Sequence, residues 1–176
     1  MKPQEKYPKP LIAIHWITFL LLAFTFIRGN MLEDLEFTEA NMNAFRMHAV
    51  PGVIILILTL IRMRIKRRNK DRLPEELDYY GPLHKVVVES VHKLLYILLI
   101  LTPLFGFIMM YKTGALQYDL GGAFPEGVEF QETLETFHKV FAFSLLGLVA
   151  LHFVGGLIYL SKNGIEFFKK MCILIK

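Results

Sequence analysis

The sequence predicts an all-α integral membrane protein, a four-helix bundle formed by a single domain of 176 residues. Composition is the first indication, because 54% of the residues are hydrophobic and the mean hydropathy of +0.43 is high for a soluble globular protein. The second indication is the presence of four apolar segments that are each long enough to cross the hydrocarbon core of a bilayer. The third is the segregation of basic and acidic residues between alternate connections, which is typical of multi-pass membrane proteins.

The first apolar segment covers residues 11–29 and carries His15 near its start. A secretory signal peptide is the alternative interpretation of an apolar segment this close to the N-terminus. Such a peptide would be followed by a cleavage site of small residues. Here the segment runs into Arg28-Gly29-Asn30, and three further apolar segments follow. We therefore interpret it as a membrane span.

The remaining spans follow in order along the chain. The second covers about residues 45–65, and its most apolar part runs from Val53 to Ile61. The third covers about residues 86–111 and the fourth about residues 137–160, and both exceed the roughly 20 residues that a spanning helix needs. Residues 163–175 then mix lysines with aromatic and aliphatic side chains. This mixture predicts a helix that lies along the membrane surface.

Charge in the connections predicts the orientation of the bundle. Residues 62–72, between the second and third spans, hold seven basic residues and one acidic residue, and both terminal segments are rich in lysine. By the positive-inside rule these parts face the cytoplasm, so both termini are expected there. The two opposite connections are acidic and are expected outside; their acidic residues are Glu33, Asp34, Glu36, Glu39, Asp119, Glu126, Glu129, Glu132 and Glu135. A juxtamembrane position explains the basic cluster, so no nucleic-acid partner is predicted.

Four histidines lie within or at the ends of the predicted spans. His15 lies near the cytoplasmic side of the first span, whereas His48 and His138 open the second and fourth spans from the outer side. His152 follows His138 by 14 residues, which is about 21 Å along a helix and brings it to the depth of His15. The same spacing is close to four full turns, so both rings share one helix face. The depths predict an outer pair, His48 with His138, and an inner pair, His15 with His152.

Two stacked bis-histidine sites are the arrangement that a pair of b-type haems requires, because each iron takes two axial nitrogens from opposite faces of the macrocycle. One zinc ion fits poorly, since its ligands must all lie within about 2.1 Å of it. The single cysteine, Cys172, offers no cysteine pair for an iron–sulfur cluster. A histidine in a membrane can also be a packing residue or part of a proton relay, although only Glu89 would supply an acidic group to such a relay. We predict that the four paired histidines are haem ligands.

Further candidate residues surround the two pairs. His92 lies about two turns into the third span, near the depth of the inner pair, and has no matching histidine on another span. We interpret it as a hydrogen-bonding contact for a quinone rather than as a ligand. Arg28, Arg46 and Lys139 lie near the outer pair, where they could bind haem propionates or guide an anion inward. Snorkelling towards lipid headgroups explains these three cations equally well.

On these residues the chain resembles the bacterial cytochrome b-561 family, whose membrane domain is also similar to the cytochrome b subunits of nickel hydrogenases. The resemblance runs nearly end to end and rests on Ile14-His15-Trp16, the segment from Asn43 to His48, Gly52, His92, Tyr96, Pro103, Gly106, Met109-Met110-Tyr111, His138 and His152. It implies a multi-pass protein of the bacterial inner membrane with two haems b. It further implies electron exchange with ubiquinone or menaquinone, with superoxide as a donor on the outer side.

The outer charge bears on the identity of the donor. The two outer connections hold nine acidic residues against Arg28, Arg46 and Lys112. An anion such as superoxide is captured faster by a cationic surface, so the acidic face favours a cationic redox protein or a dehydrogenase subunit as partner. The prediction is a di-haem oxidoreductase that moves electrons between an outer donor and the quinone pool. The alternatives are a haem-bearing anchor subunit of a larger dehydrogenase or hydrogenase complex, and a haem-free bundle.

Overall fold

Four long helices account for most of the chain in the computed structural model, which describes residues 6–74, 81–125, 127–128, 131–164 and 170–171. In those residues the structure contains no strand. The elements in chain order are α1 (Lys9–Asn30), the 3₁₀ turn η1 (Glu39–Asn41), α2 (Met42–Arg68), the 3₁₀ turn η2 (Lys70–Arg72), α3 (Pro82–Lys112), the short α4 (Ala115–Asp119) and α5 (Glu132–Asn163). The all-helical membrane bundle predicted from the sequence is therefore confirmed.

Each long helix is longer than the apolar segment inside it. The helices contain 22 to 32 residues, which corresponds to about 33–48 Å, against a hydrocarbon core of roughly 30 Å. Local chemistry explains two of the extensions. Proline at the first position of α3 requires no N–H partner there. The basic residues Lys66, Arg67 and Arg68 at the end of α2 complement the negative end of its dipole.

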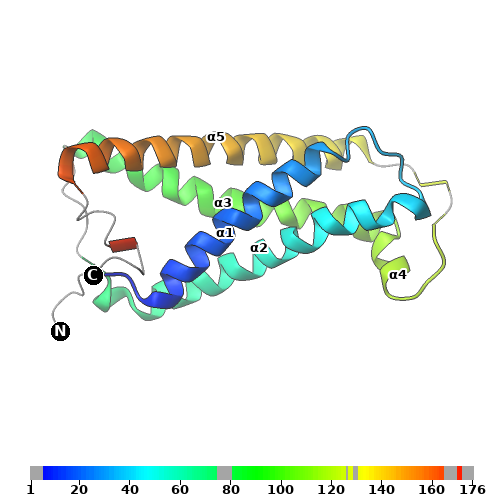
Figure 1. The fold of residues 1–176 in the computed structure, drawn as a ribbon, viewed down its shortest axis with the longest axis horizontal. Coiled ribbons are helices and arrows are strands. Elements are labelled where there is room, and N and C mark those ends of the chain that lie inside the picture. Colours follow the sequence, from blue (N-terminus) through cyan, green and yellow to red (C-terminus); the bar gives the residue numbers. More distant parts are fainter. Residues whose placement is uncertain (1–5, 75–80, 126, 129–130, 165–169, 172–176) are drawn as a thin grey trace.

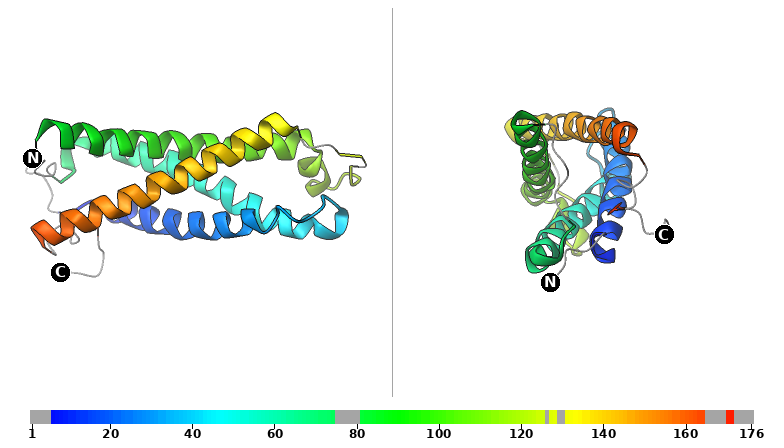
Figure 2. Two further views of the ribbon diagram at one scale, coloured as in Figure 1. Left: turned by 90° about the horizontal axis from the view of Figure 1, so that it is seen from above. Right: turned by 90° about the vertical axis from the view of Figure 1, so that its left-hand side faces the viewer.

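The helices form the four sides of a square when the bundle is viewed from its end (Figure 2). The closest backbone packing joins α1 to α2, α2 to α3 and α3 to α5. α1 crosses diagonally in front of the other helices in Figure 1, and the short α4 turns back beneath the start of α2 at the opposite end from the termini. We call the end that carries α4 and η1 the outer end, following the predicted topology.

Both ends of the described chain lie together at the other end of the bundle (Figure 1). The backbone N–H of Tyr7 donates to the carbonyl of Lys170 at 3.2 Å, and the indole Nε1 of Trp16 donates to the carbonyl of Met171 at 2.9 Å. Residues 170 and 171 therefore rest against the start of α1. Most of the surface helix predicted for residues 163–175 lies outside the described residues. That this end faces the cytoplasm stays a prediction.

The bundle buries few side chains for its size. Only seven hydrophobic residues of the described chain are buried, namely Leu11, Ile12, Ile14, Met42, Ile55, Ala115 and Leu145. Large apolar side chains such as Leu20, Ile57 and Phe153 are instead at least half exposed. Exposure of this kind is unfavourable in water but suits a lipid environment, where the surrounding hydrocarbon is as apolar as the side chains. The space between the helices is also loosely packed, since it contains a cavity of about 650 Å³.

The orientation can be tested by cysteine labelling in intact cells. With Cys172→Ser as background, Glu36→Cys reports on the outer connection and Lys70→Cys on the basic connection, both at exposed positions. A membrane-impermeant maleimide should label position 36 in intact cells and position 70 only after lysis, because basic connections stay on the cytoplasmic side. Labelling of position 70 in intact cells would contradict the predicted topology and indicate the reverse orientation.

Candidate functional site

In each of the two histidine pairs expected from the sequence, the two rings lie next to each other in the structure. In the outer pair, the rings of His48 on α2 and His138 on α5 have centroids 5.9 Å apart and planes inclined by 79°. In the inner pair, the rings of His15 on α1 and His152 on α5 have centroids 6.2 Å apart and planes inclined by 71°. α5 thus contributes one ring to each pair, and α1 and α2 each contribute one.

The ring separations fit two imidazoles bound to one metal ion from opposite sides. With a nitrogen–metal bond of about 2 Å on each side, the two ring centroids would be roughly 6 Å apart. Both pairs meet this separation. The described chain has no group of three or more histidine, cysteine, aspartate or glutamate side chains arranged to hold a metal ion, so an ion enclosed by protein ligands alone is not favoured. A planar group that carries its own metal and lacks two axial ligands fits the donor set.

Each ring of the outer pair is held by a backbone carbonyl of a neighbouring helix. Nδ1 of His48 donates to the carbonyl oxygen of Thr25 on α1 at 2.9 Å. Nδ1 of His138 donates to the carbonyl oxygen of Thr102 on α3, also at 2.9 Å. Because the proton is on Nδ1, Nε2 keeps its lone pair and can bind a metal.

A cavity of about 650 Å³ lies against the outer pair and is lined by both of its histidines. This volume lies within the range of roughly 300–1,000 Å³ that is common for small-molecule and cofactor sites. Its wall is mostly apolar, and it includes Thr25 and Thr102, whose hydroxyl oxygens are buried without a hydrogen-bond partner. An apolar cavity with two ligand nitrogens and two unpartnered hydroxyls suits a flat, mainly apolar cofactor.

Two glycines that touch the outer rings were not singled out for this role by the sequence. A Cβ atom on Gly29 would lie 2.8 Å from Cε1 of His48, and one on Gly106 would lie 3.1 Å from Cε1 of His138. The available signal was a repeated threonine–glycine spacing of four residues, Thr25 with Gly29 and Thr102 with Gly106. By contrast, a Cβ on Gly52 would meet no protein atom within 4 Å, although Gly52 lines the cavity.

The inner pair has a third histidine beside it. The ring of His92 lies 5.0 Å from that of His152, and its Nδ1 donates to the carbonyl of Val88 one turn earlier on α3 at 2.8 Å. This separation is about 1 Å shorter than that expected for two rings on opposite sides of a metal. The geometry therefore fits His15 better than His92 as the partner of His152.

Polar groups of α2 and α3 border the inner histidines. Nε of Arg62 donates to the hydroxyl of Tyr96 at 3.1 Å, and the ammonium of Lys66 lies 5.9 Å from the centre of the same ring. Tyr96 follows His92 by four residues, so the two side chains share one face of α3. His92 is also exposed. The arrangement leaves a histidine and a tyrosine side by side at the edge of the inner pair.

The cations expected near the outer pair differ in their surroundings. Arg46 and Lys139 line the cavity, whereas Arg28 does not. Nε of Arg28 is buried without a hydrogen-bond partner. Lys139 lies 3.0 Å from a carboxylate oxygen of Glu135 and 3.3 Å from one of Glu33. These ion pairs lower the positive potential that Lys139 presents to an approaching anion.

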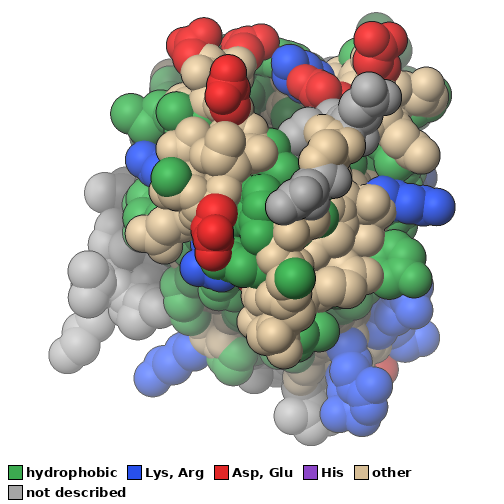
Figure 3. All heavy atoms as spheres, turned by 90° about the vertical axis from the view of Figure 1, so that its right-hand side faces the viewer, with side chains coloured by type: hydrophobic (Ala, Val, Ile, Leu, Met, Phe, Trp, Pro, Cys, Tyr) green, Lys and Arg blue, Asp and Glu red, His purple; other side chains and the backbone are tan. Residues whose placement is uncertain are grey.

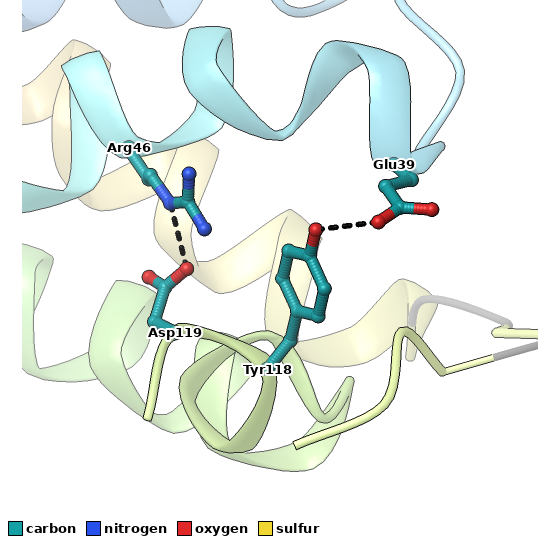
Figure 4. Close-up of polar contacts among 4 residues, drawn as sticks. All are labelled: Glu39, Arg46, Tyr118 and Asp119. Atoms are coloured by element: carbon teal, nitrogen blue, oxygen red, sulfur yellow. Dashed lines mark hydrogen bonds and ion pairs between the residues drawn. The ribbon is translucent and has the colours of Figure 1, made fainter. Parts of the chain in front are cut away.

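Polar contacts at the outer end connect Arg46 with Asp119 and Tyr118 with Glu39 (Figure 4). Nε of Arg46 donates to Asp119 at 2.7 Å, and its guanidinium lies 5.5 Å from the centre of the Tyr118 ring. The hydroxyl of Tyr118 donates to Glu39 at 2.7 Å. This hydrogen bond raises the pKa of Tyr118 above its ordinary value. These contacts join α4 to η1 and α2.

Acidic side chains gather along the upper edge of the outer end (Figure 3). Glu33, Asp34 and Glu36, all exposed, belong to the connection after α1. Arg46 and Lys139 are both paired with carboxylates, so neither presents its full positive charge to the solvent. Pairing of these two cations with carboxylates weakens the electrostatic steering of a free anion towards this face.

Comparison with known proteins gives two results. A family model described as prokaryotic cytochrome b561 matches residues 6–164, which include both histidine pairs. The chain is also similar to a protein of Yersinia pestis described as probable superoxide oxidase CybB, with 24% identity over 161 residues. This alignment covers 88% of the present chain and 89% of the relative.

Proposed function

Because the chain belongs to the prokaryotic cytochrome b561 family, we propose that it is a membrane cytochrome with two haems b that transfers electrons between an outer donor and the quinone pool. Membership of the family makes it a membrane cytochrome b with a role in electron transfer. We further propose the number of haems, their ligands and the quinone as reaction partner. The observation that carries it is the presence of two imidazole pairs with ring separations of 5.9 and 6.2 Å.

In this proposal His48 and His138 bind the outer haem iron, and His15 and His152 bind the inner one. A haem b at each pair supplies a one-electron carrier, so that the two together connect the two sides of the membrane. The carbonyls of Thr25 and Thr102 keep Nε2 of the outer ligands free of a proton.

Arg46 and Lys139 are the proposed partners of the outer haem propionates, since both line the outer cavity. The carboxylate partners of Lys139 are exposed and that of Arg46 is partly exposed, and ion pairs at exposed positions contribute only about 0–1 kcal/mol. Replacing these side-chain carboxylates by haem propionates would therefore cost little free energy. Arg28 does not line the cavity, but its positive charge interacts electrostatically with His48.

The quinone site is proposed beside the inner pair, at His92 and Tyr96. Nδ1 of His92 is occupied by Val88, so its Nε2 can accept a hydrogen bond from the hydroxyl of a reduced quinone. The hydroxyl of Tyr96 accepts from Arg62 and keeps its own proton to donate to the carbonyl of an oxidised quinone. Acceptor and donor lie one turn apart on α3. This pairing matches the two forms of a quinone.

The acidic outer end supports a cationic redox protein as the donor, while the similarity to a probable superoxide oxidase supports superoxide. The alternative function is a haem-bearing anchor that relays electrons for a larger dehydrogenase or hydrogenase complex. The bacterial inner membrane is the proposed location in either case.

Activity of the isolated protein separates the two functions. The purified chain in detergent or liposomes should reduce a short-chain ubiquinone or menaquinone when it is given superoxide or a reduced cationic redox protein whose potential lies below that of the quinone. An anchor subunit would show haem reduction without quinone turnover, and it would copurify with a dehydrogenase subunit from its native membrane.

Substitution of single histidines tests the assignment of ligands. His48→Ala or His138→Ala should remove one b-type component from the reduced-minus-oxidised spectrum, and His15→Ala or His152→Ala should remove the other, since an axial position is lost in each case. His84→Ala, at the start of α3, serves as the control and should retain both components. Retention of both haems in any of the four variants would contradict the assignment.

His92→Leu and Tyr96→Phe test the quinone site. Each change removes one hydrogen bond of about 0.5–1.5 kcal/mol, so the rate of quinone reduction should fall by roughly three- to tenfold while both haems remain. Stopped-flow measurement of haem reoxidation by quinone gives the rate. Loss of the inner haem in His92→Leu would instead make His92 a ligand.

A further inference from the structure

We propose that Thr25 with Gly29 on α1, and Thr102 with Gly106 on α3, form two equivalent ligand seats that hold the outer histidines and lower the redox potential of the outer haem. This inference rests on the proposed function, because it requires a haem at the outer pair. It assigns a positioning role to four residues that lie on the helices facing the two ligands. Each seat consists of a carbonyl acceptor and a glycine one turn later.

The spacing of four residues has a physical reason. In an α-helix each side chain leans towards the N-terminus and covers the turn before it. A side chain at position 29 would therefore cover the carbonyl of Thr25, and one at position 106 would cover that of Thr102. Glycine uncovers the oxygen, which can then accept a lateral hydrogen bond in addition to the one inside its helix. This is how the Nδ1 atoms of His48 and His138 come within 2.9 Å of these oxygens.

The fit around the glycines is tight, and tighter in one seat than in the other. A Cβ on Gly29 would lie 2.8 Å from Cε1 and 3.0 Å from Nδ1 of His48. A Cβ on Gly106 would lie 3.1 Å and 3.4 Å from the same atoms of His138. Carbon atoms in ordinary contact are about 3.5–4.0 Å apart. An alanine at either position must therefore displace the ring and lengthen its bond to the carbonyl.

The bond to the carbonyl also has an electronic consequence. Donation from Nδ1–H to a carbonyl makes the imidazole more basic and Nε2 a stronger ligand. A stronger donor stabilises ferric iron more than ferrous iron, which lowers the potential of the haem. Within the described residues no such carbonyl acceptor is seen for His15 or His152. The seats therefore act on the outer haem alone.

Gly29→Ala and Gly106→Ala, compared with Gly147→Ala, test the proposal in the purified full-length protein. Gly147 lies on α5, and a Cβ there would meet no atom within 4 Å. Redox titration with optical detection gives the potential of each haem, and low-temperature EPR reports the ligand field of each ferric iron. We expect the outer haem to rise in potential and change its EPR signal in both seat variants, more in Gly29→Ala. The inner haem and Gly147→Ala should match the wild type.

Unchanged potential and EPR signal of the outer haem in both seat variants would overturn the proposal. Loss of the outer haem from Gly29→Ala with retention of the inner haem would support it, as the more crowded seat. If Gly29→Ala does not accumulate in the membrane, the milder Gly106→Ala decides. A wild-type protein that lacks an outer haem would defeat the proposed function itself, and it would be recognised before any variant is measured.

Discussion

Two hydrogen bonds between histidine side chains and helix backbone determine how the outer half of the bundle is built. They join His48 to the carbonyl of Thr25 and His138 to that of Thr102. A hydrogen bond of this kind contributes about 0.5–1.5 kcal/mol, but an imidazole N–H left unpaired in an apolar interior would cost more. The bonds connect α2 to α1 and α5 to α3, which are also closely packed helix pairs. Each pair thereby becomes a unit that presents a ring at a fixed angle.

The two units meet across a loosely filled interior. Each supplies one ring of the outer pair and one ring of the inner pair, because His15 lies on α1 and His152 on α5. Few apolar side chains of the described chain are buried, and the cavity of about 650 Å³ occupies the space where a soluble bundle would have its core. In this account a bound macrocycle takes the place of core side chains, and ligand binding contributes to the stability of the fold. The packing of α2 against α3 joins the two units directly, and bound cofactors would join them further.

The sequence predicted the parts of this structure that depend on periodicity and charge. Four spans follow from hydropathy, and the pairing of His15 with His152 follows from a 14-residue spacing on one helix. The contacts of Gly29 and Gly106 could not be predicted, because a glycine touches a ring on another helix only after the register of the two helices is known. The pairs of Arg46 with Asp119 and of Lys139 with Glu33 were missed for a similar reason, since the partners lie 73 and 106 residues apart. Net charge counts give the sign of a face but not which cations are neutralised on it.

The number of haems bound to each polypeptide distinguishes two ligand sites from one. A pyridine haemochrome assay on the purified wild-type protein, combined with quantitative amino-acid analysis, gives this ratio without any assumption about the donor or the quinone. Two imidazole pairs at different depths predict a value near two haems b per chain. A value near one would contradict the account, because one of the two pairs would then be a packing contact between histidines rather than a ligand site.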